Sequence, residues 1–387
     1  MNTLTSPDMH MSLQNALDQA LVFDGAVHGG VLTVATAEDR VALATGLADP
    51  RHSRRMRPDD QFHAASITKM ITATTAMLLV EDGLLDLDRG IGAYLPAATI
   101  AGLHRHGGQV YENRLTMRQL LSHTSGVADC FGDGPPDASG NSPFMAALLA
   151  EPDRLWQPHE VLAWTRRNLS ARFAPGGGWH YSDTGYVLAG LVIERVAGDK
   201  LHDVMRSRLF ARLGMHSTYM LYREARRPAN AARPVSMPAV GDIAYGAMRA
   251  TSADWASGGL VTNAADLTLF MRAFAEKRIF KNDACRRQML PWIETGERGV
   301  FYGLGLRRFD LSALGLPGYG GLWGHTGFLK AFALYWPAMD VTICGTLNQS
   351  RARGVFSQLR PVAELVPAVL RLLDADQPMK GGMLHKG

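Results

Sequence analysis

Two side chains one helical turn apart, Ser66 and Lys69, have the residue types that nucleophilic chemistry needs. Apolar or methyl-bearing residues follow them at three- and four-residue intervals, which predicts a helix beginning near Ser66. In such a helix the Lys69 amine reaches the Ser66 hydroxyl. The free amides and the positive dipole end at the helix start also favour negative charge that develops there. The sequence therefore predicts a hydroxyl, an amine and an anion-stabilising helix end at one place.

Two later stretches have residues that can complete such a site. Tyr181-Ser-Asp183 follows a glycine-rich approach and precedes an apolar helical pattern, which predicts a tyrosine hydroxyl on a loop facing a cleft. Gly324-His-Thr-Gly327 lies between a glycine-rich connection and a strand predicted from Leu329. Glycines of this kind let the edge of a strand approach a ligand closely.

With these motifs in this order, the sequence resembles the penicillin-recognising serine hydrolases. This superfamily includes class C β-lactamases, DD-peptidases, D-amino-acid-specific peptidases and amidases, and family VIII carboxylesterases. The resemblance covers residues 12 to 375. The motifs that carry it are Ser66-x-x-Lys69, Leu121-Ser-His-Thr-Ser-Gly126, Tyr181-Ser-Asp183 and His325-Thr-Gly327.

The resemblance implies a role for each matched residue. Ser66 would be the acyl-accepting nucleophile, and Lys69 and Tyr181 would handle the protons of acylation and deacylation. The backbone N–H groups of Ser66 and Phe328 would form the oxyanion hole. For Lys69 to act as a base its pKa must fall, and burial would lower it.

Asp183 departs from the family pattern, because the tyrosine motif usually ends in Asn. An extra carboxylate near Lys69 would either pair with that lysine or bind a cationic group of the substrate. The sequence leaves both alternatives open, and Asp183 is placed among the expected substrate-binding residues.

His325 is the second departure, since β-lactamases usually carry Lys and many esterases carry Trp at this place. The change removes a permanent positive charge that would hold a substrate carboxylate. We expect His325 to hydrogen-bond toward Tyr181 or the substrate, and to bind substrate together with Thr326 and Gly327.

These residues predict a serine hydrolase that cleaves an ester or an amide through a Ser66 acyl-enzyme. A carboxylesterase and a D-amino-acid-specific amidase or peptidase are the leading interpretations. The alternatives are an acyltransferase that uses the same Ser-Lys-Tyr site and a penicillin-binding or sensor protein that does not turn over. The two departures weigh against a β-lactamase.

The order of predicted elements indicates an α/β (α+β) fold. Strand patterns come from both ends of the chain and helical patterns from the middle, which predicts a mostly antiparallel sheet flanked by helices. Residues 1–96 and 296–387 would form the sheet domain, residues 97–295 a largely helical inserted domain, and the active site would lie between them. We expect an unanchored tail at 1–10, a helix capped by Ser12, and a last helix over 359–373.

Composition limits the classes of partner and compartment. The chain has 387 residues, 47% of them hydrophobic and 20% charged, with a formal net charge of +4 and dispersed arginines. These values favour a globular enzyme without a nucleic-acid footprint. No secretory signal and no membrane span are apparent, and three cysteines fit a reducing cytoplasm. We expect a small ester, amide or short-peptide substrate, no cofactor and no metal, and leave homo-oligomers open.

Overall fold

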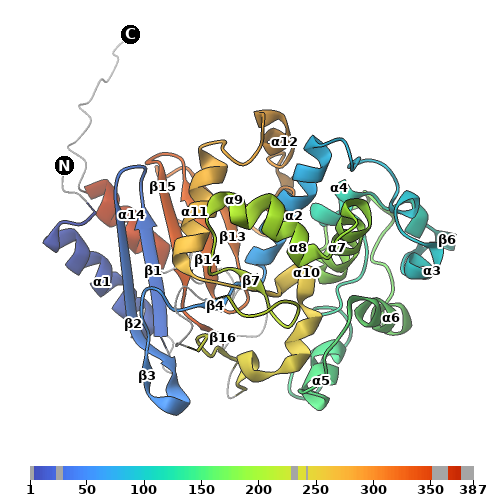
Figure 1. Cartoon of the computed structure of the whole chain (residues 1–387), viewed down its shortest axis with the longest axis horizontal. Helices are drawn as coiled ribbons and strands as arrows, with labels where there is room; N and C mark the ends of the chain where they lie inside the picture. Colours follow the sequence, from blue (N-terminus) through green and yellow to red (C-terminus); the bar gives the residue numbers. More distant parts are fainter. Residues whose placement is uncertain (1–3, 23–28, 228–233, 241–242, 351–364, 376–387) are drawn as a thin grey trace, which may run out of the picture.

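The fold is built around one large antiparallel sheet (Figure 1). The computed structural model describes residues 4–22, 29–227, 234–240, 243–350 and 365–375. The sheet has nine strands in the order β10-β11-β12-β13-β14-β15-β1-β2-β3. In chain order they are β1 (Gly29–Ala35), β2 (Arg40–Asp49), β3 (Arg54–Arg55), β10 (Ile293–Glu294), β11 (Val300–Tyr302), β12 (Arg307–Asp310), β13 (Gly321–Thr326), β14 (Ala331–Trp336) and β15 (Val341–Thr346). The expectation of an antiparallel sheet made from both ends of the chain is confirmed.

The two faces of the sheet are both covered, which explains why its central strands are almost wholly apolar. Phe332 and Leu334 of β14 point to one face, where α1 (Pro7–Val22) and α14 (Leu365–Ala375) pack. Ala331 and Ala333 point to the other face and join the cluster that includes the middle of the chain. Alternation with a period of two thus divides the core into two layers.

The first terminal helix starts earlier than predicted, and the described part of the last one agrees with the prediction. Helix α1 begins at Pro7, so the expected tail up to residue 10 is wrong. Ser6 Oγ accepts a hydrogen bond from the Met9 amide, and Pro7 suits the first helical position because its missing N–H needs no partner there. Helix α14 is described from Leu365, and the earlier part of the predicted last helix lies outside the described residues.

Strand β13 is one of the strands that were not predicted from the sequence. The His-Thr-Gly motif was expected between a glycine-rich connection and the strand from Leu329, and Gly321 and Gly324 lower the apparent strand propensity of this stretch. In the structure it pairs with β12 on one side and β14 on the other. Tertiary pairing therefore overrides local propensity and brings the His-Thr-Gly motif onto the sheet.

The middle of the chain forms a helical layer beside the sheet, with α2 (Ile67–Glu81) at its centre (Figure 1). Helix α2 packs against α7 and α10, and α11 covers the sheet at β1, β14 and β15. The other helices are α3 (Ala97–Ile100), α4 (Met117–Leu121), α5 (Pro143–Ala150), α6 (Pro158–Asn168), α7 (Asp183–Ala197), α8 (Leu201–Met205), α9 (Ala211–Leu213), α10 (Trp255–Gly258), α11 (Ala264–Ala275) and α12 (Asp283–Gln288).

Short strands tie this helical layer together. Strands β4 (Phe62–His63), β7 (Tyr219–Met220) and β9 (Leu260–Thr262) form a small sheet of their own. Two strand pairs complete the set, β5 (Arg105–His106) with β6 (Gln109–Val110), and β8 (Ala239–Val240) with β16 (Gln349–Ser350). One hydrophobic cluster runs from the sheet into the helices, so the division into two domains stays a prediction.

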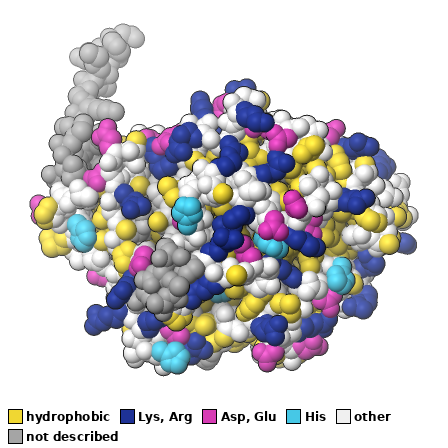
Figure 2. Space-filling view, in the orientation of Figure 1, with side chains coloured by type: hydrophobic (Ala, Val, Ile, Leu, Met, Phe, Trp, Pro, Cys, Tyr) yellow, Lys and Arg dark blue, Asp and Glu magenta, His cyan; other side chains and the backbone are white. Residues whose placement is uncertain are grey.

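The surface and the cysteines are unremarkable for a globular chain. On the face shown in Figure 2, Lys and Arg side chains are interspersed with acidic and apolar ones. The thiols of Cys130, Cys285 and Cys344 are buried and unpaired. Within the described ranges, none of the helices has the length and apolar character needed to cross a bilayer.

Candidate active site

Ser66 lies immediately before the first residue of α2, as the spacing predicted. The residue before it, Ala65, has a φ of +47°, in the left-handed region that costs an L-residue about 1–2 kcal/mol. Such strain persists only where the surrounding structure enforces it. Ser66 itself keeps helical torsions and is 8% exposed. The turn therefore places the hydroxyl at the positive end of a helix whose body is buried.

Lys69 lies one turn further along α2 and is fully buried. Its Nζ is 3.2 Å from Ser66 Oγ and donates to the backbone oxygen of Ser257 at 3.0 Å. It also makes a close ion pair with Asp183 Oδ1. An ammonium has three N–H groups, so these three acceptors use its whole donor capacity.

The electrostatics of Lys69 differ from the expectation. Burial, the largest single effect, lowers the pKa of Lys69, but the charge and hydrogen bond of Asp183 together with Tyr181 and Tyr302 outweigh burial and raise that pKa above its ordinary value. Lys69 is therefore an ammonium at neutral pH. Of the two alternatives for Asp183, the structure has the ion pair with Lys69.

Tyr181 completes the group around the nucleophile. Its Oη donates to Ser66 Oγ at 2.8 Å, and the Lys69 Nζ lies 4.7 Å from the centre of its ring. Burial has the largest effect on the pKa of Tyr181 and raises it. The positive charge of Lys69 has the second largest effect and opposes that rise without cancelling it. The hydroxyl therefore keeps its proton at neutral pH and can donate it.

The chain around Tyr181 is held by local hydrogen bonds. Ser182 caps α7, since its Oγ accepts from the Gly185 amide. The Ser182 amide donates to His123 Nδ1 at 3.0 Å, and the His123 ring packs 4.3 Å from the Tyr181 ring, centre to centre. Tyr181 thus lies on the loop just before α7, as predicted, with Asp183 as the first residue of the helix, and His123 helps to hold this loop in place.

Two backbone amides lie where an oxyanion hole was expected. The amide groups of Ser66 and Phe328 donate no hydrogen bond to any other described residue. Gly327 brings their two segments together, because a Cβ on it would lie 2.7 Å from the backbone oxygen of Ala64. The two amides thus have no partner among the described residues, and their role as an oxyanion hole stays a prediction.

His325 has other partners than those expected. It is fully buried on β13, and its Nδ1 lies 2.7 Å from the backbone oxygen of Thr326. A carbonyl oxygen only accepts, so Nδ1 carries the proton. Burial, with a smaller contribution from Arg307, holds the pKa of His325 well below its usual range, so Nε2 accepts from Tyr302 Oη at 3.0 Å. His325 therefore bonds Tyr302 and not Tyr181, and its expected contact with the substrate stays a prediction.

The sequence reasoning missed two side chains near the site, Tyr302 and Arg307. The Tyr302 ring packs edge-on against Tyr181 at 6.4 Å. Arg307 is buried, donates to Thr326 Oγ1 at 3.3 Å and lies 5.4 Å from the centre of the Tyr181 ring. The available signal was an arginine that points inward from a strand. That signal can be recognised only once the bounds and pairing of strand β12 are known.

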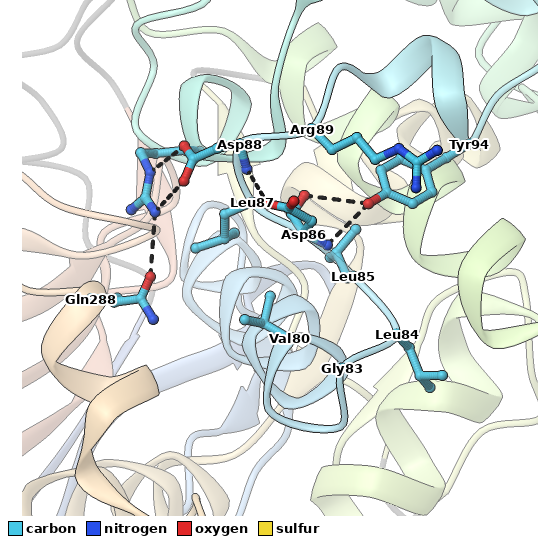
Figure 3. A pocket seen from close by; sticks show the side chains of 11 residues that line it. Val80, Gly83, Leu84, Leu85, Asp86, Leu87, Asp88, Arg89, Tyr94 and Gln288 are labelled. Atoms are coloured by element: carbon cyan, nitrogen blue, oxygen red, sulfur yellow. Dashed lines mark hydrogen bonds and ion pairs between the residues drawn. The ribbon is translucent and has the colours of Figure 1, made fainter.

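A separate pocket lies at the other end of α2 (Figure 3). It holds about 400 Å³ and contains none of the predicted site residues. Helix α2 has 15 residues, so this pocket is about 20 Å from Ser66 along the helix. Its lining consists of Val80, Gly83, Leu84, Leu85, Asp86, Leu87, Asp88, Arg89, Tyr94, Arg118 and Gln288. Among the described residues, no group of His, Cys, Asp and Glu side chains is arranged to hold a metal ion.

Comparison with known proteins finds solved structures and curated sequences that are similar to this chain. Solved structures that match include a D-amino acid amidase from Ochrobactrum anthropi (TM-score 0.75, 26% identity, 96% of this chain and 100% of that one) and a D-stereospecific amidohydrolase from Streptomyces sp. (TM-score 0.72, 27% identity, 91% and 98%). Esterase EstB of Burkholderia gladioli is 30% identical over 58% of this chain and 55% of its own.

The matches to curated relatives span only about a third to three fifths of the length of those proteins. A family model described as Beta-lactamase, in contrast, matches residues 14–366. That range contains the Ser66 helix, the Tyr181 motif and the His325 strand. The chain belongs to the β-lactamase family.

Proposed function

We propose that this chain hydrolyses an ester or an amide through an acyl-enzyme formed on Ser66. One observation carries the proposal: Ser66 Oγ lies 3.2 Å from Lys69 Nζ and 2.8 Å from Tyr181 Oη. A hydroxyl held between two proton-handling groups at a helix start is an activated nucleophile. The unpartnered amides of Ser66 and Phe328 support a place for the developing oxyanion.

The Lys69–Asp183 pair takes the proton in this mechanism. Because Lys69 is charged at rest, it accepts the Ser66 proton only by passing one of its own to the Asp183 carboxylate. Ser66 Oγ then bonds to the substrate carbonyl carbon, and the carbonyl oxygen becomes the oxyanion. Tyr181 gives its proton to the leaving alcohol or amine as the C–O or C–N bond breaks, and regains one from Lys69. Water attacks the acyl-enzyme by the reverse proton route and releases the acid.

Two substrate classes remain for this site, small carboxylic esters and D-amino-acid amides or peptides. The names of the relatives support both, since an esterase and a D-amino acid amidase are among them. A D-aminopeptidase of Brucella ovis is a further relative, at 22% identity over 76% of this chain.

The nucleophile is tested by labelling with a fluorophosphonate and by intact-mass measurement. We expect wild type to gain one phosphonyl group, and Ser66→Ala to gain none and to lose hydrolysis of p-nitrophenyl esters. Ser207→Ala, an exposed serine far along the chain, is the control and should label like wild type. Full activity in Ser66→Ala would show that the mechanism is wrong.

A further inference from the structure

We propose that Asp254 binds the ammonium group of an amine-bearing substrate whose carbonyl carbon is attacked by Ser66. The inference rests on the proposed acyl-enzyme function and narrows it to substrates with a free amine, such as esters, amides or peptides of amino acids. It also assigns recognition of that amine to a residue outside the family motifs.

The position of Asp254 places it near the group around Lys69. Asp254 directly precedes the short helix α10, and the backbone oxygen of Ser257 in that helix accepts the hydrogen bond from Lys69 Nζ. On its other side, Tyr245 donates to Asp254 Oδ2 at 3.4 Å. The Tyr245 ring packs edge-on against Phe328, with 6.2 Å between centres. Asp254 therefore lies between the side of the site that contains Lys69 and the side that contains Phe328.

Asp254 lacks the partner that a half-buried carboxylate needs. No described cation lies within ion-pairing distance of it, and the long bond from Tyr245 is its one side-chain contact. Its side chain is partly exposed, unlike those of the residues that follow it. A carboxylate with little solvent and no cation is costly unless a ligand supplies the charge.

The charge balance around Lys69 points the same way. Asp183 already neutralises Lys69, so the negative charge of Asp254 remains uncompensated. Burial and then the repulsion from Asp183 raise the pKa of Asp254 to about 7, while Lys69 and the Tyr245 hydroxyl act in the opposite direction. A bound ammonium would restore neutrality and hold Asp254 in its ionised form.

The two other carboxylates near Lys69 are already engaged. Asp183 is paired with Lys69, and breaking that pair would remove the proton acceptor of the mechanism. Asp129 is 7% exposed, and its Oδ1 accepts the amide hydrogens of Asp183 and Phe131 at 2.9 and 3.3 Å. Of these three carboxylates, Asp254 is the one that is left available to bind a ligand.

The test compares two esters that differ in the amine alone, D-phenylalanine methyl ester and methyl 3-phenylpropanoate. At pH 7 an α-amino group of ordinary pKa carries its proton. We expect wild type to prefer the amino ester by at least tenfold in kcat/KM. Asp254→Asn should lower kcat/KM for the amino ester by about 10- to 100-fold, mainly through KM, and leave the neutral ester within about twofold.

The matched control is Asp129→Asn, the same substitution at a buried carboxyl whose pKa is also raised by burial and by Asp183. It should leave the ratio of the two esters unchanged. An equal loss in both variants would show a general electrostatic effect and overturn the inference. Equal hydrolysis of both esters by wild type, or no hydrolysis of the amino ester, would overturn it without any variant. Fluorophosphonate labelling of Ser66 separates these results, because it persists if only the amine site is wrong and fails if the acyl-enzyme itself is wrong.

Discussion

At the scale of single residues, the Lys69–Asp183 ion pair sets this site apart. A lysine beside a serine is expected to be a neutral base, but here all three of its N–H groups are used and its charge is held by a carboxylate. In the proposed mechanism the base is then the pair and not the amine. Activity would depend on proton transfer within the pair and would not require a neutral Lys69.

This arrangement predicts the pH profile of Asp183→Asn. Without the carboxylate, the main effect that opposes burial is lost and the pKa of Lys69 falls, and acylation then requires the neutral amine. The acid limb of kcat/KM against pH reports that pKa and should lie at higher pH in the variant than in wild type. The limb should move equally for the amino ester and the neutral ester. An unchanged profile, or a loss confined to the amino ester, would contradict the proton relay.

The same scale shows how far the site could be predicted. Ser66, Lys69 and Tyr181 were found because their spacing within short motifs reflects local structure. Tyr302 and Asp254 lie in no motif, and only the folding of distant segments brings them near Lys69. The raised pKa of Lys69 could not be predicted either, since it depends on the distance to Asp183.

At the scale of elements, the contact between the end of β13 and the start of α2 is the critical one. Gly327 follows β13, and its missing side chain lets that segment lie against Ala64, two residues before the nucleophile. The sequence indicated a strand edge near a ligand, but it did not indicate that β13 is itself a strand. Glycine is needed at this position because a side chain would not fit, and strand propensities do not reflect such a packing requirement.

We therefore expect Gly327→Ala to damage catalysis more than folding. The added methyl group would lie 2.7 Å from the Ala64 oxygen, so the backbone must shift and move the Phe328 amide. Loss of one oxyanion donor costs about 10²- to 10³-fold in kcat. Gly321→Ala, whose added Cβ would lie 3.2 Å from the nearest atom, is the control at the other end of β13. Steady-state kinetics alongside a thermal melt would decide, and unchanged kcat in Gly327→Ala would count against the oxyanion hole.

At the scale of the whole molecule, the two ends of the chain close the fold. Helices α1 and α14 pack on each other and on one face of the sheet, while the site lies on the side of the other hydrophobic cluster. The antiparallel sheet from both termini was predicted because strand patterns occur at both ends. The start of α1 was missed because its cap, Ser6, precedes a proline and a stretch that reads as polar.

This separation predicts that stability and catalysis can be changed independently. Leu17 of α1 is fully buried, and Leu17→Ala should lower the free energy of unfolding by about 2–5 kcal/mol. The kcat of the folded variant should stay at the wild-type value. Leu269→Ala on α11 removes the same atoms from a side chain that is 41% exposed, and should cost far less. Denaturant titration measures the free energy of unfolding, and kinetics at denaturant concentrations below the unfolding transition measure kcat. A large fall in kcat for Leu17→Ala would show that the two layers are coupled.

The pairing of β1 with β15 has a further consequence for how activity arises in time. The nucleophile is synthesised well before Gly327 and before β15, the strand that pairs with β1. Contacts between such distant segments form slowly, because the long loop between them must close before their favourable interactions can form. Hydrolysis should therefore be among the last properties to appear during refolding, after most of the helical signal has returned. The return of activity would then indicate that the complete sheet has formed.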